Sequence, residues 1–223
     1  LNKDHPLVAR LALQTGLPVS LHHDASAAAV AERLSGSAKG IDNFALIFVS
    51  YGLGAGIYIN GELYRGQHRF AGELGQILVP GQEGPVPIER RTALVDLIDR
   101  LGLQPNQPDL LQEIECAAQA DHPEVARWLR QAAGHLNWAI DVVDCLLDPE
   151  RVIIGGQMPA SLLRRLIATV LAVGPELTVD RGDRRLFIVE GSADPFFVAI
   201  GAAAEPITHA FAPSFSAMLK PPA

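Results

Sequence analysis

The chain has 223 residues, 48% of them hydrophobic, and a formal net charge of −7. A chain of this length can bury a substantial core, while its acidic balance and the lack of any run of more than two Lys or Arg residues exclude nucleic-acid binding by this stretch itself. It has no stretch of about 18 uncharged apolar residues, which argues against a membrane span, and its two cysteines without metal-ligand spacing indicate a reduced, cytosolic protein.

The first half of the chain predicts alternating helices and strands. Hydrophobic periodicity favours a helix over residues 6–15, closed by Gly16, and an alanine-rich helix from Asp24 to about Leu34. Strands are predicted at 18–21, 43–49, 56–60, near Leu63 and at 75–79. Residues 80–87 hold three prolines and two glycines, which indicates an exposed loop.

The second half is predicted to be mainly helical. Helices are expected at 91–101, 109–120, 122–147, 159–173 and 195–210, and strands at 151–154 and 186–189. The longest helix carries one wide apolar stripe. The tail, 212–223, is rich in proline and serine and is predicted to be disordered. Hydrophobic strands that end in glycine and lead into helices predict an α/β fold, with antiparallel hairpins beside parallel crossovers.

Glycines recur at alternate positions, Gly52, Gly54 and Gly56, between two predicted strands. Because glycine lets another backbone or a phosphate approach closely, this pattern is typical of a ligand-facing bend. A glycine-rich hairpin without a ligand would have the same sequence.

Asp24 follows one predicted strand and precedes a helix. It suits a helix N-cap, which aspartate occupies well. It also suits a carboxylate at the carboxyl end of a strand, where α/β sheets bind ligands and where it could accept a proton from a substrate hydroxyl.

Two further glycine-flanked positions are candidates. Glu73 lies between Gly72 and Gly75 at the start of a predicted strand, either facing a cleft or in an ordinary solvent-facing turn. Gly155-Gly156 ends a buried strand, either admitting a nucleotide or closing a tight turn.

In combination and order, these motifs resemble the ROK family, which groups bacterial sugar kinases with sugar-responsive transcriptional repressors. The matching segments are 23–29, 50–66, 71–75, 147–156 and 200–203. The resemblance spans about residues 6–206 and implies the actin-like ATPase (ribonuclease H-like) fold. It further implies a remnant of the first lobe at 1–36, a large α/β lobe at 37–192 with a helical insertion at about 91–147, and a final helix at 193–211 that returns to the first lobe.

The resemblance implies a set of sugar ligands. The catalytic base of the family's kinases falls on Asp24, and the neighbouring sugar-binding asparagine is His23 here. The sugar-binding glutamate falls on Glu73, the histidine three residues later is Gln76 here, and a further sugar-binding glutamate aligns with Glu89.

The nucleotide side departs from the family pattern. The phosphate-binding bend normally begins Gly-Thr-Gly, but here it reads Ser50-Tyr51-Gly52, and a bulky ring in place of the threonine argues against tight ATP binding. We therefore regard Gly52, Gly54, Gly155 and Gly156 as a degenerate nucleotide site. The family's zinc signature, one histidine and three cysteines, has no counterpart between residues 76 and 91, so no metal is expected.

These departures favour the effector-sensing and oligomerisation part of a ROK-type transcriptional regulator. Its expected partners are a sugar or sugar phosphate and a second copy of the chain. The family's first phosphate loop is missing here and would precede Leu1, and DNA would be contacted only through a domain further upstream. No membrane contact is expected. The alternative is a divergent ATP-dependent sugar kinase, with ATP and Mg²⁺ as cofactors and Asp24 as base. A third possibility is a core that binds neither ligand and serves only in dimerisation.

Overall fold

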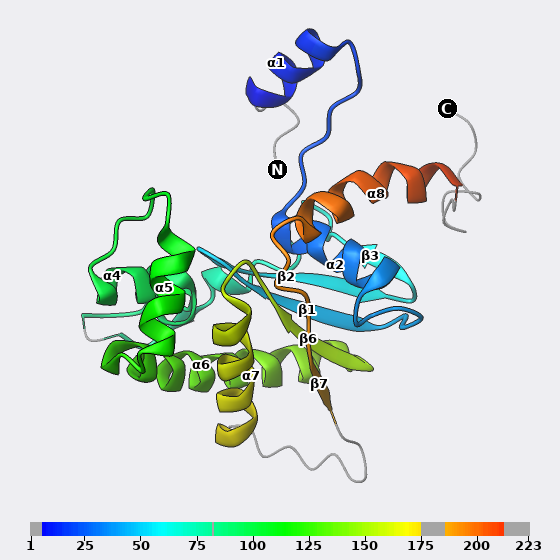
Figure 1. Ribbon diagram of the computed structural model, residues 1–223. Coiled ribbons are helices and arrows are strands. Elements are labelled where there is room, and N and C mark those ends of the chain that lie inside the picture. Colours follow the sequence, from blue (N-terminus) through cyan, green and yellow to red (C-terminus); the bar gives the residue numbers. More distant parts are fainter. Residues whose placement is uncertain (1–5, 82, 175–185, 212–223) are drawn as a thin grey trace.

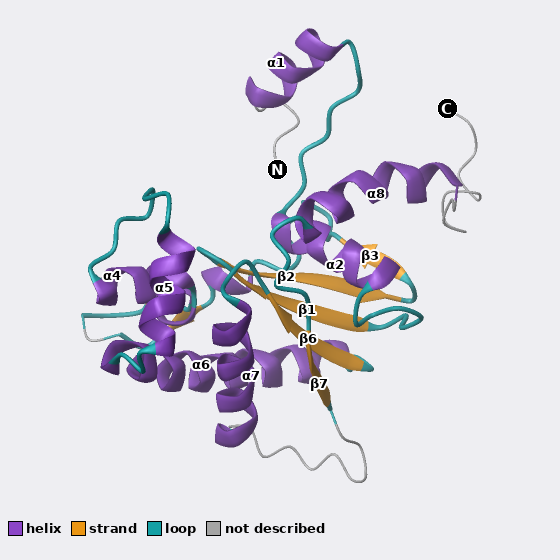
Figure 2. Ribbon diagram, viewed as in Figure 1, coloured by secondary structure: helices purple, strands orange, loops and turns teal. Residues whose placement is uncertain are grey.

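The computed structural model describes residues 6–81, 83–174 and 186–211. Its centre is a five-stranded sheet with strand order β3-β2-β1-β6-β7 (Figure 2). The strands are β1 (Phe44–Val49), β2 (Leu53–Ile59), β3 (Glu62–Tyr64), β6 (Arg151–Gly155) and β7 (Phe187–Glu190). The first three pair antiparallel, whereas β1, β6 and β7 pair in parallel. The predicted α/β fold with hairpins beside crossovers is confirmed.

Helices cover both faces of this sheet (Figure 1). The helices among the described residues are α1 (Pro6–Thr15), α2 (Asp24–Ser35), α3 (Glu89–Thr92), α4 (Leu94–Leu101), α5 (Leu110–Gln119), α6 (Pro123–Leu147), α7 (Ala160–Val173) and α8 (Phe197–Phe211). The pair α2 and α8 packs together on one face, and α6 and α7 lie on the other. The helices α4 and α5 lie beyond the turn between β1 and β2.

Strand β1 is the centre of both cores, and all six of its residues are buried. Ala45, Ile47 and Val49 belong to the larger core, with α6 and α7. Phe44, Leu46 and Phe48 belong to the smaller core, with α2. A strand buried on both faces needs a continuous apolar run, which is the pattern of residues 44–49.

Two glycines of β2 allow α2 to approach the sheet closely. A Cβ atom at Gly54 would lie 3.1 Å from the Cβ of Ala25, and one at Gly56 would lie 2.5 Å from the carbonyl oxygen of Ala25. Neither glycine has a positive φ. For these two positions, helix packing is therefore a sufficient reason for glycine.

Three predicted elements differ from the structure. Residues 18–21 form no strand, because they link α1 to α2 away from the sheet and have no strand to pair with. The predicted strand 75–79 is divided into a 3-10 helix (Leu74–Gln76) and a short strand β4 (Leu78–Val79). This strand pairs with β5 (Val86–Pro87), so the end of the predicted loop 80–87 is a strand.

The predicted helix 91–101 is two helices, because the backbone of Ala93 is extended, with ψ 165°. The backbone N–H of Leu94 donates to the carbonyl oxygen of Ser50 at 2.8 Å instead of to its own helix. The predicted tail 212–223 lies outside the described residues. The division into two lobes stays a prediction.

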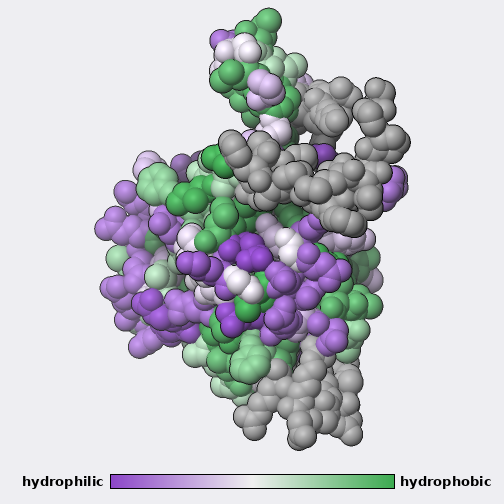
Figure 3. All heavy atoms as spheres, turned by 90° about the vertical axis from the view of Figure 1, so that its right-hand side faces the viewer, coloured by the Kyte–Doolittle hydropathy of each residue, from purple (hydrophilic) through white to green (hydrophobic). Residues whose placement is uncertain are grey.

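Helix α1 lies apart from the rest of the described chain, and none of its residues is buried. Leu7 and Leu13 are 48% and 88% exposed, and hydrophobic side chains are visible on α1 at the top of Figure 3. Within the described ranges, no helix is both long and apolar enough to span a bilayer.

Candidate active site

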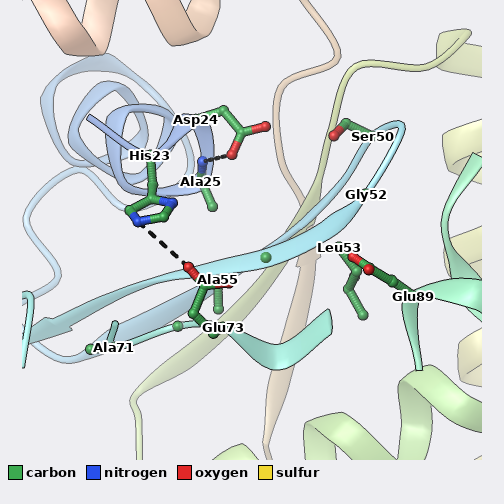
Figure 4. Close-up of a pocket in the computed structure, with 12 residues that line it drawn as sticks. His23, Asp24, Ala25, Ser50, Gly52, Leu53, Ala55, Ala71, Glu73 and Glu89 are labelled. Carbon is green, nitrogen blue, oxygen red and sulfur yellow. Dashed lines mark hydrogen bonds and ion pairs between the residues drawn. The ribbon is translucent and has the colours of Figure 1, made fainter. Parts of the chain in front are cut away.

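Two cavities meet between α2 and the turn that follows β1. The first, of about 130 Å³, is lined by the side chains of His23, Asp24, Glu73 and Glu89 and by backbone of β2 (Figure 4). The second, of about 770 Å³, is walled by the turn 50–51, α4, α5 and the segment from β6 into α7. Asp24 and Ser50 line both cavities.

Asp24 is exposed at the start of α2, as its first helical residue. The N-cap interpretation is wrong by one residue, since His23 occupies the cap and its side chain makes no capping hydrogen bond. Oδ1 of Asp24 accepts a hydrogen bond from the backbone N–H of Ala25 at 2.8 Å.

The second carboxylate of the first cavity, Glu73, lies close to His23, which precedes Asp24 in the sequence. Nε2 of His23 lies 3.5 Å from Oε1 of Glu73, and both side chains are about one third exposed, at 34% and 37%. Figure 4 shows Glu73 directed toward His23 across the cavity. Asp24 and Glu73, from distant parts of the sequence, therefore line one cavity.

The third carboxylate, Glu89, is the first residue of α3. Its Oε1 accepts a hydrogen bond from Nε2 of Gln76 at 3.2 Å. Gln76 itself does not line the cavity. Of the predicted sugar ligands, four line the first cavity and Gln76 contacts one of the four.

The predicted nucleotide glycines are divided between two roles. Gly52 and Gly54 line the first cavity. Gly155 and Gly156 line neither, and a Cβ at Gly156 would lie 2.7 Å from the carbonyl carbon of Val49, so close packing against β1 requires this glycine.

Tyr51 is 54% exposed and forms part of the wall of the second cavity. The volume of this cavity is about 770 Å³. The effect of this ring on ATP binding stays a prediction, and the threonine hydroxyl of the family pattern is absent from this position.

Four helices begin at the second cavity. Asp24, Leu94, Leu110 and Ala160 are the first residues of α2, α4, α5 and α7, and all four line it. In the part of the chain that the structure describes, no Lys or Arg side chain lines this cavity. Helix N-termini carry partial positive charge and unpaired backbone N–H groups, which favour anions such as phosphate.

Other residues of the second cavity have no sequence signal. Met158 and Glu115 line it, and Glu115 accepts a hydrogen bond from Oγ of Ser161 at 2.6 Å. Glu115 is on α5 and Met158 follows β6, and only the folded chain brings them together.

A basic cluster lies beside the first cavity. His22, Arg65 and Arg69 line a cavity of only about 10 Å³ that shares His23 with the first one. Burial lowers the pKa of His22, and the nearby charges of Arg65, Arg69 and His23 lower it further. Burial also lowers the pKa of Arg65, followed by the effect of Arg69.

Comparisons with known proteins agree with this fold and with these motifs. The bifunctional enzyme NanE/NanK of Brucella suis biovar 1 is 35% identical over 153 residues, which are 69% of this chain and 29% of that enzyme. The chain therefore spans under a third of this relative's length.

Solved structures with the same fold include both functional classes. A ROK family glucokinase from Streptomyces griseus, in complex with glucose and AMPPNP, is 26% identical with a TM-score of 0.71, covering 90% of this chain and 72% of that one. A ROK family transcriptional regulator, a homologue of the E. coli MLC protein, is 27% identical with a TM-score of 0.62, covering 88% and 54%. The sequence profile of the ROK family matches residues 1–204, so the resemblance is confirmed: the chain belongs to the ROK family, with the actin-like ATPase fold of its sugar kinases.

Proposed function

We propose that the chain forms the sugar and nucleotide sites of an ATP-dependent sugar kinase in which Asp24 is the general base. The observation that carries this proposal is the position of Asp24, the residue whose carboxylate lines both cavities. A base for phosphoryl transfer must reach the acceptor hydroxyl and lie beside the phosphate donor.

The first cavity suits a sugar. Asp24, Glu73 and Glu89 offer carboxylate oxygens, which accept hydrogen bonds from hydroxyl groups. Nε2 of His23 lies 3.5 Å from Oε1 of Glu73, and Nε2 of Gln76 donates a hydrogen bond to Glu89, so each carboxylate that is not the base has one polar neighbour. In the proposed reaction, the acceptor hydroxyl gives its proton to Asp24 as its oxygen forms a bond to the γ-phosphorus of ATP, while the bond from that phosphorus to the β,γ-bridging oxygen breaks and ADP leaves.

The second cavity suits a nucleotide. Its helix N-termini would hold the phosphates, and apolar walls that include Leu110 and Met158 would pack against the base. Asp24 and Glu115 are its carboxylates, and Mg²⁺ is usually bound by one or two carboxylates together with phosphate oxygens. A bound Mg²⁺ would neutralise charge on the phosphates.

The test is a coupled assay on the full-length protein with ATP, Mg²⁺ and a panel of hexoses and N-acetylhexosamines. We expect Asp24→Asn to lower kcat by at least about 100-fold while sugar binding changes only a few-fold. Glu113→Gln is the control, because Glu113 is an exposed carboxylate on α5 that lines neither cavity. Sugar binding by a folded wild type without any turnover would refute the kinase.

A transcriptional regulator is the second candidate, favoured by one observation, the Tyr51 side chain in place of a phosphate-binding hydroxyl. In that function, a sugar or sugar phosphate in the first cavity would bias closure and so reposition DNA-binding domains on another segment of the protein, within a homo-oligomer. Sugar-dependent release of the full-length protein from DNA, without ADP formation, would support it.

A further inference from the structure

A buried glutamate, Glu32, lies on α2 and makes no contact with either cavity. It is 1% exposed. Its Oε2 accepts a hydrogen bond from the backbone N–H of Ser37 at 2.6 Å, and its Oε1 accepts one from the backbone N–H of Ser192 at 2.7 Å. Each oxygen of this buried carboxylate therefore accepts a hydrogen bond from a backbone N–H group, and the two groups are distant from each other in the sequence.

Those two backbone groups belong to the two chain segments that join the helix pair α2 and α8 to the sheet. The first connection, residues 36–43, runs from α2 to β1, and the second, residues 191–196, runs from β7 to α8. The first connection is also bound to the end of β7, since Oγ of Ser37 donates to the carbonyl oxygen of Glu190 at 2.7 Å. Glu32 is the side chain that holds both connections at once.

The backbone leaves room for this carboxylate and for little else. A Cβ atom at Gly191 would lie 2.8 Å from Oε1 of Glu32, and one at Gly36 would lie 2.9 Å from its Cα. The position of Glu32 therefore requires the glycine at Gly36, whereas the glycine at Gly191 is required by Glu32 together with Ile153, whose Cγ2 would lie 2.7 Å from the added Cβ. Hydrogen bonds to an ionised acceptor are stronger than neutral ones, so this contact is a rigid one.

Several of the remaining contacts of α2 with its neighbours are made by small apolar groups, beside an ion pair at 2.8 Å between Arg33 of α2 and Asp42 of the first connection. Ala25 and Ala29 face the glycines of β2, and the backbone of Ala27 faces Gly201 of α8. Contacts between small apolar groups fix the distance between two elements but only weakly resist the sliding of one element along the other. A buried carboxylate that accepts two hydrogen bonds instead fixes one position of α2 along its helix axis. Asp24 is eight residues before Glu32 on the same helix, a distance of about 12 Å.

We propose that Glu32 is a positioning residue, which fixes α2 against both connections. It thereby sets the distance between two walls of the first cavity. One wall carries His23 and Asp24, and the other carries Glu73 and Glu89. Glu32 acts through α2 and touches no ligand. The inference applies to a kinase and to a regulator alike, because both need the two walls at a defined separation. Residues that set such a separation are expected where a few chain segments join two parts of a structure.

The test compares Glu32→Gln with Glu150→Gln in the full-length protein. Glu150 is a matched control, because it also accepts two backbone N–H groups of the first connection, from Asp42 at 3.3 Å and Asn43 at 3.0 Å. Glu150 is exposed, and of the two connections it accepts hydrogen bonds only from the first. Sugar affinity by calorimetry and amide hydrogen exchange are measured at a temperature at which both variants are folded.

We expect Glu32→Gln to weaken sugar binding at least tenfold and to speed amide exchange at residues 22–27, in addition to residues 36–38 and 191–193. Glu150→Gln should stay within twofold of wild type in both measurements. A purely local structural role would change exchange only around Ser37 and Ser192. Wild-type affinity and wild-type exchange at 22–27 in folded Glu32→Gln would overturn the proposal.

A second variant covers the case in which Glu32→Gln does not fold. Gly36→Ala presses a methyl group on Glu32 from the first connection while keeping the carboxylate, since the three nearest atoms to the added Cβ all belong to Glu32, and it should shift exchange at 22–27 in the same direction. If the wild type binds no sugar, the proposed function fails, and exchange at 22–27 alone decides the role of Glu32.

Discussion

The glycine series of the bend, Gly52, Gly54 and Gly56, separates a packing role from a ligand-binding role. None of the three has a positive φ, so alanine strains the backbone at none of them. An added Cβ at Gly52 would meet only Oε2 of Glu89, at 3.4 Å, which is an ordinary contact. At Gly54 it would lie 3.1 Å from the Cβ of Ala25, and at Gly56 2.5 Å from the oxygen of Ala25.

These distances give a graded cost. The nearest atom to the Cβ at Gly56 is the Cβ of Ala29, and the oxygen of Ala25 follows at 2.5 Å, where a carbon–oxygen contact is normally about 3.3 Å or longer. Gly56→Ala therefore forces α2 outward by roughly 1 Å, an overpacking in the upper half of the usual cost of about 1–3 kcal/mol. Replacing glycine by alanine also restricts the unfolded chain, which returns about 0.4–1 kcal/mol at each position. We therefore expect a net destabilisation of about 1–2 kcal/mol for Gly56→Ala, about zero for Gly54→Ala and a slight stabilisation for Gly52→Ala.

Urea unfolding of the full-length protein measures this series. With a slope of about 2 kcal/mol per molar, Gly56→Ala should lower the midpoint by about 0.5–1 M at constant slope. Gly52→Ala should raise the midpoint by about 0.2–0.5 M but weaken sugar binding several-fold, because Gly52 lines the first cavity. A wild-type midpoint for Gly56→Ala, or the largest loss of stability for Gly52→Ala, would show that α2 does not pack on β2 as described.

Two further predictions concern side chains around the first cavity. Gln76→Ala should weaken sugar binding a few-fold in calorimetry without changing the unfolding midpoint, because it removes only the exposed hydrogen bond that orients Glu89; unchanged affinity would contradict this. The lowered pKa of His22 means that the unfolded chain binds its proton more readily than the folded chain does, so this residue should reduce stability as the pH falls below about 6.5. His22→Gln should flatten the decline in the urea midpoint between about pH 7 and pH 5.5, and an unchanged decline would show that His22 is not its source.

Local patterns predicted the elements with the strongest internal signals. The continuous apolar run of β1 and the long apolar stripe of α6 were correct, since both are determined by burial along one segment. The break at Ala93 had no local signal, because the group that ends α3 there is the carbonyl of Ser50, in a turn more than forty residues earlier. The strand expected at 18–21 failed for the same reason, since pairing is a property of two segments.

In the candidate site, too, local sequence predicted some residues, while others depend on contacts between distant segments. Sequence motifs identified His23, Asp24, Glu73 and Glu89, and the structure brings these four into one cavity. Sequence alone left the role of the glycines open, and packing distances assign Gly56 to the contact with α2. Glu115 and Met158 lay outside every motif, because they reach the second cavity only through the placement of α5 and of the segment after β6.

Tyr51 decides how far the two candidate functions differ. Tyr51 lines the second cavity, and in the proposed kinase this residue loses one hydroxyl contact to phosphate. A hydrogen bond to a charged group contributes about 1.5–3 kcal/mol, which corresponds to about 10- to 150-fold in kcat/KM. If the proposed kinase is correct, Tyr51→Thr should raise kcat/KM for ATP by one to two orders of magnitude in the coupled assay, with Tyr64→Thr, an exposed tyrosine on β3, as the control. If Tyr51→Thr gives no ATP turnover while sugar binding persists, the second cavity does not hold phosphate in a reactive position, and the regulator is the function that fits.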